Sequence, residues 1–182
     1  MLLAVLILLI LITSLFIRID YSYFFRSSKD FDRIIENASR RHGIDPCLVK
    51  AVIWRESRFN PNARGSKGEI GLMQIRMNYS AADWSEKNGI PIPCEGVLFH
   101  PEINIEIGSW YLSRARKRWK DFEHSTEMAL AEYNAGFAGM KKWIPETTDA
   151  NILERIQYEP TKEYVSAIME QYESYIKKRT EP

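Results

Sequence analysis

Apolar residues after about position 30 recur three and four positions apart, and a two-residue alternation never persists for long. This spacing predicts amphipathic α-helices, with strands limited to at most a small hairpin. Glycine and proline mark the helix boundaries: "SKDFDRIIENASRRHG" is expected to end at Gly43, and "HPEINIEIGSWYLSRARKRW" to begin at Pro101. We therefore expect an all-α or nearly all-α domain.

Four later segments complete this pattern. "NYSAADWSEKNG" is expected to be a helix ending at Gly89, and "STEMALAEYNAG" a short helix that stops at Gly136. "TKEYVSAIMEQYESYIKKR" is the expected closing helix. The segment "IPIPCEGVLF" contains two prolines, so it is expected to be a loop rather than a regular helix.

One predicted helix carries a carboxylate on its apolar face. Asp45, followed by proline, is expected to cap its start, and Asn60-Pro61 to end it. Val52 and Ile53 lie four and three positions before Glu56, so Glu56 continues the apolar stripe. Desolvation disfavours the charged form of a carboxyl group, and a carboxyl that resists ionisation suits a general acid.

An ordinary structural role for Glu56 is the alternative. Arg55 and Arg58 flank it, so Glu56 would then form an ion pair with one of them, or with another base, at the rim of the core.

The N-terminus differs from the rest of the chain. Residues 2–17 are apolar apart from Thr13 and Ser14 and carry no charge. We interpret residues 1–25 as an uncleaved signal anchor, a transmembrane segment, with a cleaved signal peptide or a buried core helix as alternatives. The basic residues that follow this run would, by the positive-inside rule, keep the main domain in the cytoplasm.

Composition excludes some partners. The 25 Lys and Arg residues nearly balance the 24 Asp and Glu residues, and a net charge of +1 argues against strong attraction to nucleic acid or anionic lipid. Cys47 and Cys94 fit either a disulfide or two free thiols. Neither cysteine has a second ligand at metal spacing, and His42, His100 and His124 are scattered, so no metal site and no cofactor are expected.

Three stretches occur in an order that resembles a known family: "ESRFNPNARGSKGEIGLMQI", "AEYNAGFAGMKKW" and "YEPTKEYV". Together they resemble the soluble lytic transglycosylases of bacterial cell walls, which belong to the goose-lysozyme-like group. The resemblance covers roughly residues 30 to 175. It implies a mainly α, lysozyme-like (goose-type) helical domain with a two-lobed cleft over residues 26–182, preceded by the anchor.

The resemblance also implies a reaction. Glu56 matches the single catalytic glutamate of the family, which cleaves the β-1,4 bond between N-acetylmuramic acid and N-acetylglucosamine without adding water. Glu56 would protonate the glycosidic oxygen, and the N-acetyl group of the substrate would stabilise the charge at C1. Ionised Glu56 would then take the proton of the C6 hydroxyl, whose oxygen attacks C1 to form a 1,6-anhydro end.

Eight further positions match residues that would bind the substrate: Ser57, Ser66, Gly71, Met73, Gln74, Tyr133, Asn134 and Tyr164. Ser66 would face the N-acetyl group, and Gly71 would let the backbone approach the sugar. Met73 would form an apolar wall, and Gln74 would hold the sugar by its amide. The ordinary alternatives are core packing for Met73 and a surface position for Gln74.

The remaining matches come from the second half of the chain. Tyr133 and Asn134 would orient the carboxylate and the N-acetyl group, and Tyr164 would close the cleft. For both tyrosines the alternative is simple packing in the core.

The chain departs from the family pattern in three places. After "GLMQ" the family usually has a proline followed by Thr-Ala, whereas this chain has "IRMNYSAADW". Position 69 is Glu where many members have alanine, and residues 160–162 are Pro-Thr-Lys where the family has Glu-Thr-Arg.

Two rival functions remain open. A hydrolysing muramidase needs a second carboxylate, for which Glu69 and Glu132 are candidates. A catalytically weak peptidoglycan-binding or assembly module is the other. The leading interpretation, with glycan strands as substrate and the membrane as anchor, places the domain outside the cytoplasmic membrane, in the periplasm, because murein is not available in the cytoplasm.

Overall fold

The computed structural model describes residues 28–92 and 94–181. The predicted anchor, residues 1–25, lies outside this part of the chain. In the described part, every helix is too short or too polar to cross a membrane.

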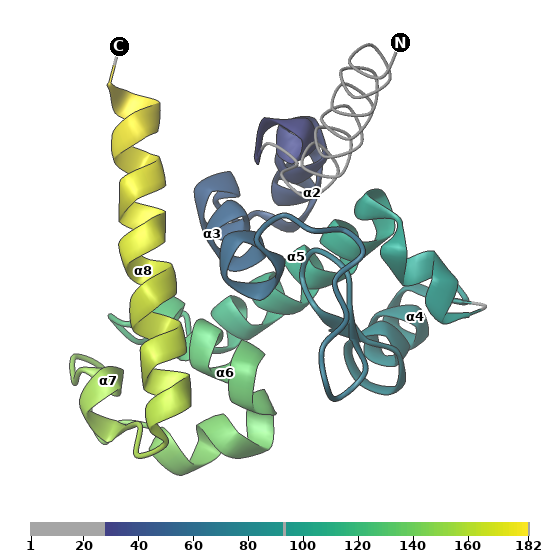
Figure 1. The fold of residues 1–182 in the computed structure, drawn as a ribbon. Coiled ribbons are helices and arrows are strands. Elements are labelled where there is room, and N and C mark those ends of the chain that lie inside the picture. The colour runs from purple at the N-terminus through teal and green to yellow at the C-terminus, as the bar shows by residue number, and fades with distance from the viewer. Residues whose placement is uncertain (1–27, 93, 182) are drawn as a thin grey trace, which may run out of the picture.

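The described chain is mainly helical (Figure 1). Its elements, in chain order, are η1 (Ser28–Phe31), α2 (Asp32–His42), α3 (Pro46–Ser57), β1 (Glu69–Ile70), β2 (Ile75–Arg76), η2 (Met77–Ala81), α4 (Ala82–Asn88), η3 (Glu95–Phe99), α5 (Pro101–Arg118), α6 (Ser125–Met140), η4 (Lys141–Trp143), α7 (Ile152–Arg155) and α8 (Glu159–Thr180). The predicted limit on strands is confirmed for these residues, since β1 and β2 form one short antiparallel hairpin.

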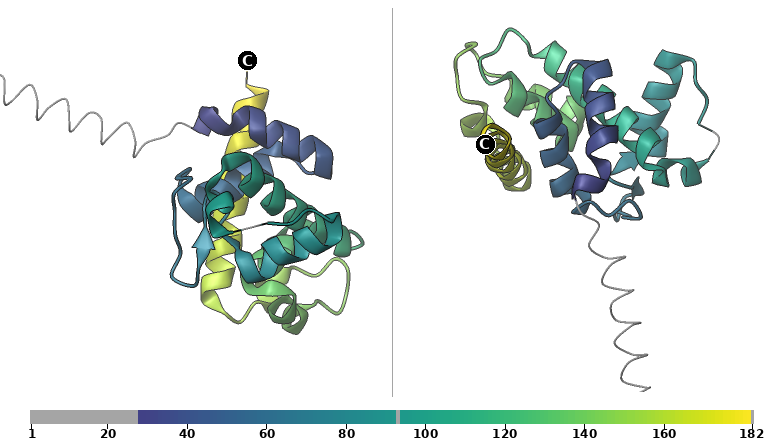
Figure 2. Two further views of the ribbon diagram at one scale, coloured as in Figure 1. Left: turned by 90° about the vertical axis from the view of Figure 1, so that its right-hand side faces the viewer. Right: turned by 90° about the horizontal axis from the view of Figure 1, so that it is seen from above.

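Helix α5 runs across the centre of the molecule and packs against α2 and α6 (Figure 1). Helix α3 packs against α8. Seen from above, α8 lies at one side and α4 at the other, with α2 between them (Figure 2). The side chains at these contacts, including Val52, Ile53, Ile107 and Leu112, are completely buried, so one apolar core holds the helices together.

The predicted starts of two helices are confirmed. The Asp45 carboxylate accepts a hydrogen bond from the Cys47 N–H at 2.8 Å and so caps α3, and Pro101 occupies the first turn of α5. The predicted end of α3 is wrong: the helix ends at Ser57, because Arg58 and Phe59 take left-handed φ angles of 52° and 64°.

The predicted stop at Gly136 is confirmed as a break in α6: Gly136 has the non-helical angles φ 72° and ψ 165°, and a second helical stretch continues from this kink to Met140. One other boundary differs from the prediction. The expected loop "IPIPCEGVLF" ends in the short 3-10 helix η3.

A buried amide fixes the hairpin region to α5. The side chain of Asn104 has no solvent exposure; its Oδ1 accepts from the Met73 N–H at 2.7 Å. Its Nδ2 donates to the carbonyls of Ile70 at 2.8 Å and Leu98 at 2.7 Å. Gly71 has φ +76°, and a Cβ there would lie 2.5 Å from Asn104 Nδ2, so only glycine allows this approach.

Replacing Asn104 by alanine should therefore be strongly destabilising. The change leaves three buried backbone groups without partners, and we expect it to lower the free energy of unfolding by about 3 kcal/mol. Asn78→Ala is the matched control, because Asn78 is exposed, and its loss should stay below about 0.5 kcal/mol. Urea unfolding curves of both variants measure the difference, and equal losses would contradict the role given to Asn104.

Candidate active site

Glu56 lies in the last turn of α3, half-buried, and contacts α8. Its Oε1 accepts a hydrogen bond of 2.5 Å from the hydroxyl of Tyr164. The predicted alternative, an ion pair with Arg55 or Arg58, does not form: Arg58 stacks on Trp54 at 3.6 Å, and Arg55 lies 5.5 Å from the ring of Tyr164. Within residues 28–92 and 94–181, Glu56 has no ion-pair partner within 4 Å.

Burial raises the pKa of Glu56 to about 7. The hydrogen bond from Tyr164 and the charge of Arg55 lower this pKa, while the charge of Glu69 raises it further. A carboxyl group with a pKa near neutrality can both donate and accept a proton under physiological conditions.

The Glu56 carboxyl opens into a cleft of about 340 Å³. The cleft is lined by Glu56, Lys67, Glu69, Gln74, Arg76, Tyr79, Ser80, Tyr111, Tyr133, Asn134, Ala135 and Gly136. The hairpin and η2 thus supply one part of the lining, α3 and α5 a second, and the kinked part of α6 a third. Residues from five parts of the chain thus meet around the Glu56 carboxyl.

Two predicted tyrosines support this site from inside. Tyr164 is 3% exposed and holds Glu56, as described above. Tyr133 donates its hydroxyl to the Met73 carbonyl at 2.9 Å, which ties α6 to the hairpin turn. Desolvation raises the pKa of both phenols well above the usual value, so both remain neutral hydrogen-bond donors.

Two predicted amide side chains lie in the cleft lining. Asn134 Oδ1 accepts a 2.7 Å hydrogen bond from Thr161 Oγ1, which leaves the Asn134 Nδ2 group to donate to a ligand. Gln74 has φ 50°, and its Nε2 donates to the Gly71 carbonyl at 2.8 Å, which leaves its amide oxygen as an acceptor at the cleft.

Three predicted substrate-binding residues instead shape the cleft from behind. The Ser57 hydroxyl donates to the Leu72 carbonyl at 2.8 Å. Gly71 faces Asn104, and Met73 is fully buried against Gly108. For Met73 the prediction of an apolar wall touching substrate is corrected, because no part of its side chain reaches the surface. Ser66 is exposed on the loop before β1 and does not line the cleft.

Several residues of the site were not predicted as site residues. Lys67, Arg76, Tyr79 and Tyr111 line the cleft, and buried Thr161 positions Asn134. The importance of Asn104 could have been inferred from the sequence, because, like Glu56, it is a polar residue among apolar residues of a helix.

The two candidates for a second carboxylate occupy different places. Glu132 is 2% exposed, accepts a 2.7 Å hydrogen bond from Trp119 Nε1 and lies 3.4 Å from Arg118, outside the Glu56 cleft. Glu69 lines the cleft. Of these two, only Glu69 can act on a ligand beside Glu56.

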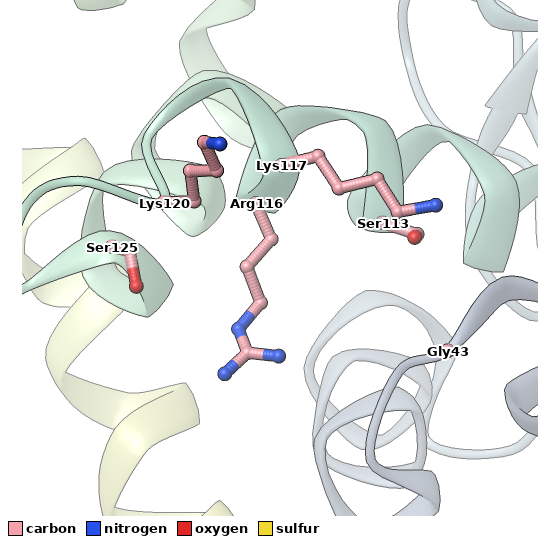
Figure 3. A pocket seen from close by; sticks show the side chains of 6 residues that line it. All are labelled: Gly43, Ser113, Arg116, Lys117, Lys120 and Ser125. Carbon is pink, nitrogen blue, oxygen red and sulfur yellow. The ribbon is translucent and has the colours of Figure 1, made fainter.

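A second cavity, of about 220 Å³, has a different chemistry (Figure 3). Arg116, Lys117 and Lys120 line it together with Gly43, Ser113 and Ser125. Their charged ends point in different directions from the end of α5. The lining of this cavity is thus basic, in contrast to the cleft that holds Glu56.

Cys47 and Cys94 are both free thiols, the first buried and the second exposed. Among the described residues, His, Cys, Asp and Glu form no group of three that could hold a metal ion.

The raised pKa of Glu56 predicts a pH-dependent cost to stability. The folded protein binds this proton up to about pH 7 and the unfolded chain only up to about pH 4.5, so stability is lost as pH rises between these values. Glu56→Gln removes the titration. Relative to this variant, the wild type should lose on the order of 2 kcal/mol of unfolding free energy between about pH 5 and pH 8.

Denaturant unfolding at both pH values measures this loss. Glu170→Gln, on the exposed face of α8, is the control and should follow the wild type at each pH. A constant difference between the wild type and Glu56→Gln would show that Glu56 is not desolvated.

Comparison with known proteins agrees with this arrangement. A family model described as the Transglycosylase SLT domain matches residues 33–156, more than half of the chain. Membrane-bound lytic murein transglycosylase E of Buchnera aphidicola is 31% identical over 104 residues, which are 57% of this chain and 47% of the relative. Membrane-bound lytic murein transglycosylase F of Desulfosudis oleivorans is 35% identical over 114 residues, 61% of this chain and 23% of the relative.

The fold is also similar to a solved structure. An inactive mutant of the lytic transglycosylase Slt from Pseudomonas aeruginosa superposes with a TM-score of 0.73 and 26% identity, over 82% of this chain and 24% of that one. The chain spans less than half the length of these curated relatives. The expected soluble lytic transglycosylase resemblance is confirmed, and the chain belongs to the Transglycosylase SLT domain family.

Proposed function

We propose that this protein is a peptidoglycan lytic transglycosylase. It cleaves the β-1,4 bond between N-acetylmuramic acid and N-acetylglucosamine without water and leaves 1,6-anhydromuramic acid ends. The observation that carries this proposal is Glu56, a carboxyl with a pKa of about 7 in a cleft, held by Tyr164 and by no counter-ion among the described residues. The names of the relatives, lytic murein transglycosylases, support the same activity.

The reaction uses Glu56 twice. Protonated Glu56 gives its proton to the glycosidic oxygen, and the C1–O bond breaks to release the N-acetylglucosamine side with a free hydroxyl. As the C1–O bond breaks, the N-acetyl oxygen of the muramoyl sugar bonds to C1. Ionised Glu56 then removes the C6 hydroxyl proton, and O6 displaces the N-acetyl oxygen from C1. Glu56 ends protonated, ready for another cycle.

The neighbouring side chains have distinct tasks in this scheme. Tyr164 orients the carboxyl and stabilises its ionised form by donating to it. Asn134, held by Thr161, presents an N–H donor for the N-acetyl oxygen, and Gln74 presents an acceptor for a sugar hydroxyl or amide.

A hydrolysing muramidase is the second candidate, and the position of Glu69 favours it. Glu69 lines the same cleft, and a second carboxylate could hold a water molecule across the sugar ring. The two reactions differ in their product, because hydrolysis leaves a reducing muramic acid end.

For location, we propose that residues 1–25 anchor the protein in the cytoplasmic membrane. Residues 26–182 then form the catalytic domain on its outer side, in the periplasm. The uncharged apolar run at residues 2–17 supports this anchor, as does the word membrane-bound in the names of the relatives.

Digestion of purified sacculi tests the function. The full chain in detergent should release muropeptides about one water lighter than hydrolysed ones, with no reducing muramic acid, as mass spectrometry measures. Glu56→Gln should lower the rate by at least about a thousandfold and leave the fold intact, because the amide can neither give nor take the proton. Reducing ends would identify a muramidase. If the folded protein releases no muropeptides, the result would contradict an enzyme and indicate a binding or assembly module.

The pH profile tests the role of Tyr164. The first step needs protonated Glu56, so kcat/KM should fall as the pH rises above about 7. Tyr164→Phe removes a hydrogen bond that lowers the pKa of Glu56, so this fall should move to higher pH by about one unit.

Tyr172→Phe is the matched control on the same helix. Its hydroxyl donates to Asp45, away from the cleft, so the fall in kcat/KM should stay where it is in the wild type. A fall at unchanged or lower pH in Tyr164→Phe would contradict the role of that hydroxyl.

A further inference from the structure

Tyr79 is an aromatic side chain exposed inside the cleft. It is 62% exposed, yet it lines the same cavity as Glu56. It lies in η2, a π-helix at Met77–Ala81, and such turns occur frequently at functional sites. This is also the stretch "IRMNYSAADW", in which the chain departs from the family pattern. An aromatic ring exposed in a cleft offers a flat apolar surface to a ligand.

The plane of this ring is held by Arg76. The guanidinium carbon of Arg76 lies 4.0 Å from the ring centroid of Tyr79, in a cation-π stack. The Arg76 N–H also donates to the Ser80 side-chain Oγ at 3.2 Å, which ties Arg76 to the residue that follows Tyr79 in η2. One face of the ring is therefore covered by the guanidinium, and the high exposure of Tyr79 shows that the opposite face is open.

Two cationic side chains, Arg76 and Lys67, line the same cleft as this ring. Arg76 lies opposite Glu69 in the hairpin register, but the two side chains form no ion pair within 4 Å. Among the described residues, neither Arg76 nor Lys67, which also lines the cleft, is paired with a carboxylate. Their N–H groups remain available to hydroxyl, amide or carboxylate oxygens of a ligand.

We propose that Tyr79 and Arg76 form a sugar-binding platform that takes a pyranose ring of the glycan strand next to the bond that Glu56 cleaves. A β-linked pyranose has an apolar C–H face, which packs on the open face of Tyr79 while Arg76 supports the ring from behind, and a rim of oxygens, which can accept from Lys67 in the same cleft. This deepens the proposed function and rests on it, because it adds a binding contact for the same glycan substrate.

Binding to a catalytically silent protein tests the platform. Glu56→Gln in the full chain is titrated by calorimetry with a soluble β-1,4-linked hexamer of N-acetylglucosamine, which shares the backbone of the glycan strand. Adding Tyr79→Ala should raise Kd by about five- to tenfold. Adding Tyr79→Phe, which keeps the ring, should leave Kd within about twofold.

Tyr158→Ala is the matched control. Tyr158 is 60% exposed, as Tyr79 is, but it does not line the Glu56 cleft, so Kd should not change. An unchanged Kd in Tyr79→Ala, or no binding by Glu56→Gln itself, would overturn the platform. The sacculus digestion judges the proposed function separately, because the released ends depend on Glu56 and not on the strength of binding.

Discussion

The contact between Glu56 and Tyr164 is the constraint on which the site depends. A carboxyl group that is taken out of water without a counter-ion retains its proton, and this is the state that the proposed reaction needs first. The position in the last turn of α3 acts in the same direction, since the negative end of the helix dipole disfavours an anion there. The hydrogen bond from the Tyr164 hydroxyl lowers the pKa of Glu56 and so limits this rise. Burial has the largest effect on the pKa of Glu56, and because the hydroxyl comes from α8, the packing of α3 on α8 contributes the opposing effect.

The opposite part of the cleft depends on a different interaction. Strands of two residues cannot stabilise a hairpin by their own ladder, so the positions of Gln74 and Arg76 must be fixed from outside. Asn104 does this from α5, with two hydrogen bonds to backbone groups of the hairpin region and a third to η3. Tyr133 does it from α6 through the Met73 carbonyl. The cleft is thus held by buried polar side chains that bind backbone groups. Its geometry is preorganised before any substrate arrives.

Part of this arrangement could be predicted from local sequence signals, and part could not. Pro101 is correctly predicted as a helix start, because a proline in the first turn is a local signal. Glu56 is likewise conspicuous in the sequence, as a carboxylate on an apolar stripe, and the structure places it in the cleft. The end of α3 was missed because Arg58, which is not glycine, adopts the left-handed conformation, and no local signal marks it. The cation-π contact between Arg76 and Tyr79 is likewise not predictable from the sequence. Their contact depends on the hairpin register and on a π-turn, which are set by tertiary contacts rather than by local periodicity.

Glu69 bears on both candidate reactions, through its position and through its charge. In a hydrolase, a second carboxylate must face a water molecule with a free oxygen. Here Oε2 of Glu69 accepts a 2.8 Å hydrogen bond from the Lys67 N–H, which leaves Oε1 to face such a water molecule. The negative charge of Glu69 also raises the pKa of Glu56. That effect keeps Glu56 protonated, and the first step of either reaction needs this acid, so the two reactions differ only in what attacks C1 afterwards.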